Sequence, residues 1–201
     1  METHSQASQD IFVRYILGDK KGYFLEIGSS DPILYNNSYV LEKMGWKGIM
    51  IEYDSNYLKG YKKHRTSEYI INDARTINYK DILKSYPKNM DYLQIDLDVD
   101  NKSTLDVLNI LDETIFDDYK FATITFEHDF YRGDFFDTRK ISREIFKKRG
   151  YLLVFPDIRH GGPGTFFEDW YVHPDLVNMN KVNKIITDKS LNYLEVRNVM
   201  I

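Results

Sequence analysis

The feature that most constrains the fold is an alternation between short β-rich runs and stretches whose apolar residues lie three and four positions apart. The first pattern is typical of buried strands and the second of amphipathic helices. The expected strands are 22–27, 47–52, 68–71, 91–97, 121–127 and 151–155. Strands that alternate with helices over most of a chain form a parallel sheet covered on both faces. We therefore predict an α/β fold with a mostly parallel central sheet.

Helical patterns fill the intervals between these strands. Apolar residues within 11–16 predict an opening helix, and residues 138–149 form a strongly amphipathic one. Beyond the last of these strands lie a glycine- and proline-rich loop at 160–164 and an aromatic and acidic segment at 166–176. The tail that follows offers a final strand at 191–197.

Charge and cysteine content narrow the class of partner. The chain has 201 residues with 42% hydrophobic content, which fits one domain, 1–201, around one core. Its formal net charge is -4, so neither nucleic acid nor an anionic membrane is favoured as a partner. Cysteine is absent, and no run resembles a secretion signal or a membrane span. We expect a soluble cytoplasmic protein that binds a small molecule or a carbohydrate.

Each of the first five predicted strands ends near a carboxylate. Ligands of parallel sheets bind beyond the carboxyl ends of the strands, so these residues are the first candidates for a site. They are Glu26, Glu52, Asp73, Asp96 and Glu127. Neither G-x-G-x-x-G nor G-K-[ST] follows the first strand, which disfavours NAD and nucleoside triphosphates. A cofactor with a positive centre and a ribose, but no phosphate, fits this acidic rim better.

S-adenosylmethionine is such a cofactor, and the strand ends offer places for its parts. Gly28 is expected to leave room for the methionine portion, because a Cβ atom there would occupy the ligand's space. Glu52 is expected to accept hydrogen bonds from both ribose hydroxyls, as the acidic residue of dinucleotide folds does. Asp73 and Ala74 are expected at the adenine edge. For each carboxylate alone, the alternative is that it caps the turn after its strand.

Five stretches between residues 5 and 176 carry a family pattern. They read SQASQD, YFLEIGSSDPILYNNSYVLEKMGWKGIMIEYD, DYLQIDLDVDN, FATITFEHDFYRGD and FEDWYVHPDL. Together they resemble the FkbM-type family of class I S-adenosylmethionine-dependent methyltransferases, most specifically in the EIG loop coupled to GWKGIMIE. The resemblance implies a Rossmann-like class I methyltransferase fold and methylation of hydroxyl groups, often on sugars of glycans or glycosylated natural products.

The resemblance also implies which residues contact the cofactor. They are Glu26, Gly28, Asp31, Ser38, Glu52 and Asp73, and Ala74 and Asp96 complete the set that we predict. Gln6 and Gln9 are expected to close the pocket from the N-terminal segment, residues 1–20. The chain departs from the family pattern at Ser8, where glycine is common, at GSSDP in place of GANDG, and at Tyr53-Asp54 in place of Pro-Asp.

Methyl transfer to a hydroxyl group needs a base that takes the proton of the acceptor. His128 follows the fifth predicted strand, and imidazole titrates near neutral pH, so His128 is our first candidate for the base. The alternative is a histidine that Glu127 or Asp129 holds in a structural role. His160 and His173 are weaker candidates.

A divalent cation offers another way to loosen that proton. Asp96, Asp98 and Asp100 lie two residues apart, and side chains two apart on a strand share a face. With Glu127 from the adjacent strand, Asp96 and Asp98 could ligate Mg²⁺ or Mn²⁺ and lower the pKa of a bound hydroxyl. In this alternative Asp98 and Glu127 act in catalysis through the metal.

The acceptor is expected against the C-terminal segment, residues 160–201. The stretch Phe166–Trp170 offers aromatic faces on which a sugar ring could stack, although Trp170 is equally suited to anchor the core. Arg132, Arg139 and Arg143 could meet the phosphate of a nucleotide sugar, or form a solvated helix face. The predicted partner is therefore a sugar, a glycan or a nucleotide-sugar acceptor.

Two other functions stay open at this point. The stretch Asp96-Leu97-Asp98 matches the short D-x-D motif of metal-dependent glycosyltransferases. A non-catalytic glycan-binding protein with the same fold is the second. Binding of S-adenosylhomocysteine, of a nucleotide sugar, or of neither separates the three.

Overall fold

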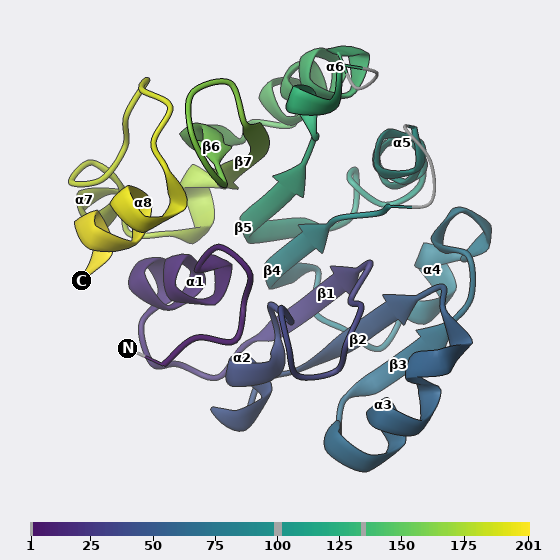
Figure 1. The fold of residues 1–201 in the computed structure, drawn as a ribbon. Helices are drawn as coiled ribbons and strands as arrows, with labels where there is room; N and C mark the ends of the chain where they lie inside the picture. The colour runs from purple at the N-terminus through teal and green to yellow at the C-terminus, as the bar shows by residue number, and fades with distance from the viewer. Residues whose placement is uncertain (1, 99–101, 134–135) are drawn as a thin grey trace.

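The computed structural model describes residues 2–98, 102–133 and 136–201, and it contains one sheet of seven strands (Figure 1). The spatial order is β3-β2-β1-β4-β5-β7-β6. The strand bounds are β1 Tyr23–Ile27, β2 Lys47–Glu52, β3 Glu68–Ile71, β4 Asn89–Ile95, β5 Lys120–Glu127, β6 Leu152–Arg159 and β7 Phe166–Val172. The first five strands confirm the sequence prediction to within two residues.

Only β7 breaks the parallel pattern of the sheet. It pairs antiparallel with both β5 and β6, whereas the other neighbouring strands run parallel. The chain moves outward from β1 through β2 to β3, and then returns to the other side of β1 with β4. This reversal places the crevice for a ligand outside the carboxyl ends of β1 and β4.

Helices lie between the strands and at both ends of the chain. Their bounds are α1 Gln9–Leu17, α2 Tyr39–Lys43, α3 Leu58–His64, α4 Tyr79–Ile82, α5 Ser103–Thr114, α6 Phe136–Lys148, α7 Met179–Val182 and α8 Tyr193–Met200. The predicted opening helix and the amphipathic helix near 138–149 are both present, as α1 and α6. Within the described ranges, no helix is long and apolar enough to cross a membrane.

The sheet lies between two helical layers. On one face, α4, α5 and α6 pack on a cluster that includes Leu25 and Phe126. On the other face, α1, α2 and α3 pack around Phe24 and Tyr92, while α7 and α8 cover the part formed by β6 and β7. Figure 1 shows α5 and α6 on one side of the sheet and α1 on the other. The prediction of a sheet covered on both faces is confirmed.

The aromatic and acidic segment differs from its prediction because most of it is strand β7. Phe167, Trp170 and Tyr171 are all buried, so their rings are not offered to a sugar. Trp170 packs against Phe12 and Phe155, with ring centroids 4.9 and 5.8 Å away. The expectation of a stacking surface at Trp170 is therefore wrong, and the alternative of a core anchor is confirmed.

The tail does not supply a last strand, because helix α8 begins at Tyr193, within the predicted range. The Asn192 side chain accepts a hydrogen bond from the Leu194 N–H at 3.0 Å, and the Glu195 side chain accepts one from the Asn192 N–H at 2.6 Å. This reciprocal pair is a capping box, a strong helix start. Val196 and Met200, four residues apart, are the buried face of the helix.

Candidate functional site

The turn after β1 is set by Gly28, which adopts a φ of 80°. The N–H groups of Gly28 and Ser29 both donate to the carbonyl of Ile51, so the turn is tied to β2. A Cβ atom on Gly28 would lie 1.5 Å from the carbonyl oxygen of Asp96. The glycine is therefore required by the neighbouring strand and by the left-handed backbone, rather than by the space of a ligand as the sequence suggested.

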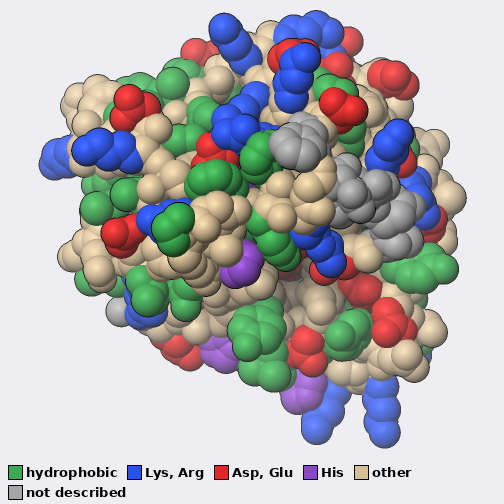
Figure 2. Space-filling view, turned by 45° about the horizontal axis from the view of Figure 1, so that its top comes forward, with side chains coloured by type: hydrophobic (Ala, Val, Ile, Leu, Met, Phe, Trp, Pro, Cys, Tyr) green, Lys and Arg blue, Asp and Glu red, His purple; other side chains and the backbone are tan. Residues whose placement is uncertain are grey.

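A cleft of about 150 Å³ opens beside this turn, at the switch point between β1 and β4. It is lined by Gly28, Ser30, Glu52, Tyr53, Asp96, Leu97 and Asp98. Figure 2 shows acidic and hydrophobic side chains close together near the middle of one face of the molecule. The structure thus brings Gly28, Glu52 and Asp96, three of the predicted cofactor residues, to one cleft.

Glu52 anchors the loop on the far side of the cleft. Its Oε2 accepts a hydrogen bond from the Ser30 N–H at 2.6 Å, and its Oε1 accepts one from the Asp54 N–H at 2.8 Å. The carboxylate is thereby held at the cleft wall, where it can accept further hydrogen bonds from a ligand.

Glu26 and Ser38 do not line the cleft, although both were predicted to contact the cofactor. The Ser38 hydroxyl donates to Glu26, and the Asn37 N–H donates to Glu26 Oε1 at 2.8 Å. Both side chains are buried. Burial raises the pKa of Glu26 to about 7, against the opposing effect of nearby Arg65. In this structure Glu26 holds the segment that leads into α2, and so shapes the cleft from behind.

Asp31, Asp73 and Ala74 also serve the local backbone. Asp31 Oδ1 accepts hydrogen bonds from two N–H groups of its own loop, both at 2.8 Å. Asp73 pairs with Arg75 at 2.9 Å and its pKa is held low by those hydrogen bonds. Ala74 is buried in the core. These contacts match the capping alternative, and an adenine contact for Asp73 and Ala74 stays a prediction.

Three carboxylates form a row across adjacent strands on one face of the sheet. Ile95 is in register with Phe126, so Asp96 follows as the neighbour of Glu127, and Glu127 is directly paired with Glu168 of β7. Paired residues on one face have Cβ atoms about 4.5–5.5 Å apart. We call Asp96, Glu127 and Glu168 the carboxylate row.

The carboxylate row holds protons near neutral pH. Burial raises the pKa of Asp96 to about 6 and that of Glu168 to about 8. Burial and the adjacent Asp96 raise the pKa of Glu127 well above its usual value. Glu127 and Asp96 share a hydrogen bond. Burial and the mutual repulsion of the two carboxylates therefore favour a proton held between Asp96 and Glu127.

The predicted metal ligands Asp96, Asp98 and Glu127 are not brought together as a ligand set. Asp98 is exposed and its Oδ1 lies 3.1 Å from an Arg132 nitrogen. Among the residues that the structure describes, the group within metal-ligand range is a different one, His128 with Asp157 and Asp169. Asp100, a further acidic residue of the motif, falls outside the described ranges. Asp96, Asp98 and Glu127 therefore do not form the predicted metal site.

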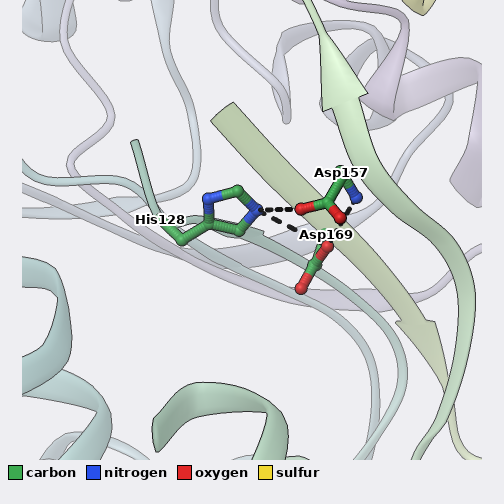
Figure 3. Close-up of side chains that lie close together, drawn as sticks. All are labelled: His128, Asp157 and Asp169. Atoms are coloured by element: carbon green, nitrogen blue, oxygen red, sulfur yellow. Dashed lines mark hydrogen bonds and ion pairs between the residues drawn. The ribbon is translucent and has the colours of Figure 1, made fainter. Parts of the chain in front are cut away.

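His128 faces away from the cleft and is fully buried. Its Nδ1 accepts a hydrogen bond from the Phe130 N–H at 3.2 Å. Its Nε2 lies 3.6 Å from Asp157 and 3.5 Å from Asp169, as Figure 3 shows. The histidine is thus held structurally, by carboxylates of β6 and β7 rather than by Glu127 or Asp129. This geometry gives it no path to an acceptor proton.

Arg139 and Arg143 of α6 complete this buried ion network rather than binding phosphate. Arg143 Nε lies 2.7 Å from Asp169, and Arg139 Nη2 lies 2.5 Å from Asp157. Despite burial, His128 and Arg143 keep the pKa of Asp169 well below its usual range. Two arginines therefore balance the charges of the two aspartates, and the group has no need of a metal ion.

A second cavity, of about 340 Å³, shares no lining residue with the cleft. It is lined by Gln6, Ala7, Tyr35, His160, Phe167 and Tyr193. Gln9 connects it to the row: its Nε2 donates to Glu168 at 3.0 Å and its Oε1 accepts from the Ala7 N–H at 2.8 Å. We call this the aromatic cavity. Gln6 lines this cavity and Gln9 donates to Glu168, and their closing of a cofactor pocket stays a prediction.

Sequence reasoning missed Glu168, Asp157 and Asp169. Glu168 carried a signal, since a glutamate within an otherwise aromatic run is unusual for a buried strand. No sequence signal marked Asp157, because a residue that follows a proline is expected in a loop.

Solved structures with a similar overall fold are methyltransferases. A precorrin-6y C5,15-methyltransferase from Geobacter metallireducens matches with a TM-score of 0.55 and 12% identity over 83% of this chain and 89% of its own. A TehB-like SAM-dependent methyltransferase from Corynebacterium glutamicum matches with a TM-score of 0.52 and 11% identity over 82% and 87%. The chain has the class I methyltransferase fold.

The same methyltransferase fold occurs in a proposed rRNA methylase from Clostridium thermocellum, with a TM-score of 0.55 and 10% identity over 86% of this chain and 98% of that one. Exclusion of a nucleic-acid partner therefore stays a prediction. No family model matches the sequence, and no curated protein matches it significantly. Membership of the FkbM-type family accordingly stays a prediction as well.

Proposed function

We propose that the protein is an S-adenosylmethionine-dependent O-methyltransferase that methylates a sugar hydroxyl. The observation that carries the proposal is the cleft at the strand switch point, where Gly28, Glu52 and Asp96 meet. Glu52 would accept the ribose hydroxyls, and the acidic rim favours a cationic sulfonium over a phosphate. Asp31 and Asp73 would act indirectly, through the loops that they cap.

When bound, S-adenosylmethionine supplies the methyl group: the acceptor oxygen bonds to the methyl carbon as the carbon–sulfur bond breaks and S-adenosylhomocysteine forms. The chain supplies position and a proton acceptor. In this proposal Asp96 is the ionised member of the pair and takes the hydroxyl proton, while Glu127 carries the proton that the two carboxylates share. General-base help of this kind contributes roughly 10²- to 10⁴-fold in rate.

The geometry favours Asp96 over the other predicted catalytic residues. His128 is enclosed by two aspartates, and Asp98 points to Arg132 at the surface. Glu127 acts in this proposal as the group that holds the shared proton and orients Asp96. The glycosyltransferase alternative loses support for the same reason, because Asp96 and Asp98 do not converge on a common ion.

Calorimetric titration with S-adenosylhomocysteine tests the cofactor assignment. Wild type should bind, and Glu52→Ala should weaken binding at least about tenfold through loss of charge-assisted hydrogen bonds. Glu144→Ala, at an exposed position on α6, is the matched control and should bind like wild type. Absence of binding to the wild-type protein would leave the non-catalytic alternative in place.

The acceptor class is tested separately with a labelled methyl donor and a panel of sugars and glycans. NMR of the product should locate the label on a hydroxyl oxygen. A label on nitrogen or carbon, or on RNA offered in the same panel, would overturn O-methylation of a sugar while leaving the cofactor assignment intact.

A further inference from the structure

A third pocket lies beside β6, and it shares no lining residue with the cofactor cleft or the aromatic cavity. Its volume is about 330 Å³, and β6 is the last strand in the sheet order. Arg143 and Lys147 reach it from α6, where residues four apart lie on one face. The pocket therefore lies between α6 and the outermost strand. Its lining residues are Arg143, Lys147, Tyr151, Leu152, Leu153 and Tyr171.

The walls of this pocket are mostly apolar. Leu153 and Tyr171 are paired across β6 and β7, so their side chains lie on the same face of the sheet, the face that α6 covers. The tyrosine hydroxyls already have partners inside the protein. That of Tyr171 donates to Asp169 at 3.1 Å, and that of Tyr151 accepts from the Phe121 N–H at 3.0 Å. The pocket thus offers mainly ring and aliphatic surface.

The apolar surface continues past Leu153 along the edge of the sheet. Leu153 also lines a neighbouring pocket of about 390 Å³, together with Pro156, Ile186, Thr187 and Asp188. Because the two pockets meet at Leu153, we call them together the edge groove. A hydrocarbon chain gains free energy with each CH₂ group that it buries along such a path. The shape of the edge groove therefore suits an elongated apolar body.

Lys147 gives one end of the edge groove a free positive charge. The other cation at that end, Arg143, is paired with Asp169 and Asp157 at 2.7 and 2.9 Å. Among the residues that the structure describes, Lys147 has no ion-pair partner, and no carboxylate lines the pocket that it borders. The far end carries Asp188 instead. An anion is therefore favoured at the Lys147 end and repelled from the other, which gives the groove a direction.

We propose that the edge groove binds a free fatty acid, with its carboxylate on Lys147 and its acyl chain over Leu153 toward Ile186. Charge complementarity selects the anionic head group, and the apolar walls select the chain. The methylene groups of Lys147 can lie along the same apolar surface while its ammonium group stays in water. This site is independent of the proposed function, because the groove and the cofactor cleft have no lining residue in common.

Octanoate, 1-octanol and octylamine separate the head group from the chain, which is the same length in all three. Their dissociation constants are measured at pH 7 by ligand-observed NMR titration, with each compound below its micelle concentration. Octanoate should bind at least about fivefold more tightly than the other two, because only a carboxylate forms a charge-assisted hydrogen bond with Lys147. Equal affinities would show an apolar surface without a head-group site, and would overturn the proposal.

Two variants assign the two ends of the groove. Lys147→Gln should weaken octanoate binding at least about fivefold and leave octanol binding unchanged. Lys148→Gln is the matched control, because it removes the same charge from the adjacent exposed residue, outside the groove. Dodecanoate should bind wild type at least about tenfold more tightly than octanoate, and Ile186→Gln should remove most of that gain. Equal octanoate affinities for the two lysine variants would overturn the head-group assignment.

Titration with and without S-adenosylhomocysteine separates the edge groove from the cofactor cleft. Octanoate should bind with the same affinity in both cases. Competition between the two would place octanoate in the cleft, so the fatty-acid inference would be overturned while the methyltransferase proposal stands. Octanoate binding that depends on Lys147, in a protein that does not bind S-adenosylhomocysteine, would support the inference and overturn the proposed function.

Discussion

Gly28 lies so close to Asp96 that a single added carbon at residue 28 would overlap the backbone of residue 96, at 1.5 Å from its carbonyl oxygen. These two residues directly follow the adjacent strands β1 and β4, and both line the cleft that opens there. The close approach of the two backbones therefore sets the width of the cleft and requires glycine at position 28.

Replacing Gly28 by alanine should strongly destabilise the protein. The new methyl group can be accommodated only if β1 and β4 separate, and the φ of 80° is unfavourable for any residue with a Cβ atom. We expect a loss of about 3 kcal/mol or more in the free energy of unfolding, measured by urea denaturation. Gly162→Ala is the control: a Cβ there meets nothing within 4 Å, so its unfolding midpoint should stay near that of wild type. Equal midpoints for the two variants would contradict the packing described here.

The strand ends were predictable from sequence because they depend on local pattern. Apolar runs that stop at Glu26, Glu52 and Asp96 mark the carboxyl edge of a parallel sheet, and sheet topology alone brings these ends together. That is why the cleft at Gly28 and Glu52 lies where the sequence placed it.

The part of the sheet where Glu127 meets Glu168 was not predictable in the same way. The pairing of Glu127 with Glu168 depends on β7 inserting between β5 and β6, a non-local choice that no short motif encodes. The prediction for His128 failed for a related reason. Local pattern shows that His128 follows β5, but it does not show its partners, Asp157 and Asp169, which lie on strands later in the chain.

The unfolding free energy should fall as pH rises, because of the carboxylate row. The pKa of Glu168 is raised to about 8 in the folded protein, against 4.5 for an ordinary glutamate. Between these values the unfolded chain loses the proton and the folded chain keeps it, so stability is full below about pH 4.5 and is lost as pH approaches 8. For Glu168 alone the loss is on the order of 4 kcal/mol.

Glu168→Gln isolates this contribution. Urea unfolding at several pH values between 5 and 8 should show a shallower decline for the variant than for wild type, because the amide does not titrate. The hydrogen bond from Gln9 survives in the variant, since the amide oxygen still accepts it. A variant with the same slope as wild type would show that Glu168 is ionised in the folded protein throughout this range.

Arg143 should be essential for stability because it neutralises Asp169. The Asp169 side chain is 0% exposed and receives two Arg143 hydrogen bonds, at 2.7 and 2.8 Å. Arg143→Met leaves that carboxylate buried beside a single histidine, and loss of one partner of a buried pair costs about 3–5 kcal/mol. Lys147→Met, one turn later on α6 and exposed, controls for the change in helix charge. If both variants unfold at the same urea concentration, the network contributes nothing measurable.

The base assignment is tested by comparing Asp96→Asn with His128→Asn once an acceptor is in hand. Asp96→Asn removes the proposed proton acceptor and should lower kcat about 10²- to 10⁴-fold. His128→Asn keeps an oxygen where Nδ1 accepts the Phe130 N–H, but loses the contacts of Nε2 with Asp157 and Asp169. Its main effect should therefore be on the free energy of unfolding, with kcat close to wild type. Calorimetry with S-adenosylhomocysteine on both variants separates catalysis from cofactor binding. A His128→Asn variant that folds and binds S-adenosylhomocysteine normally, but does not turn over, would return the role of base to the histidine.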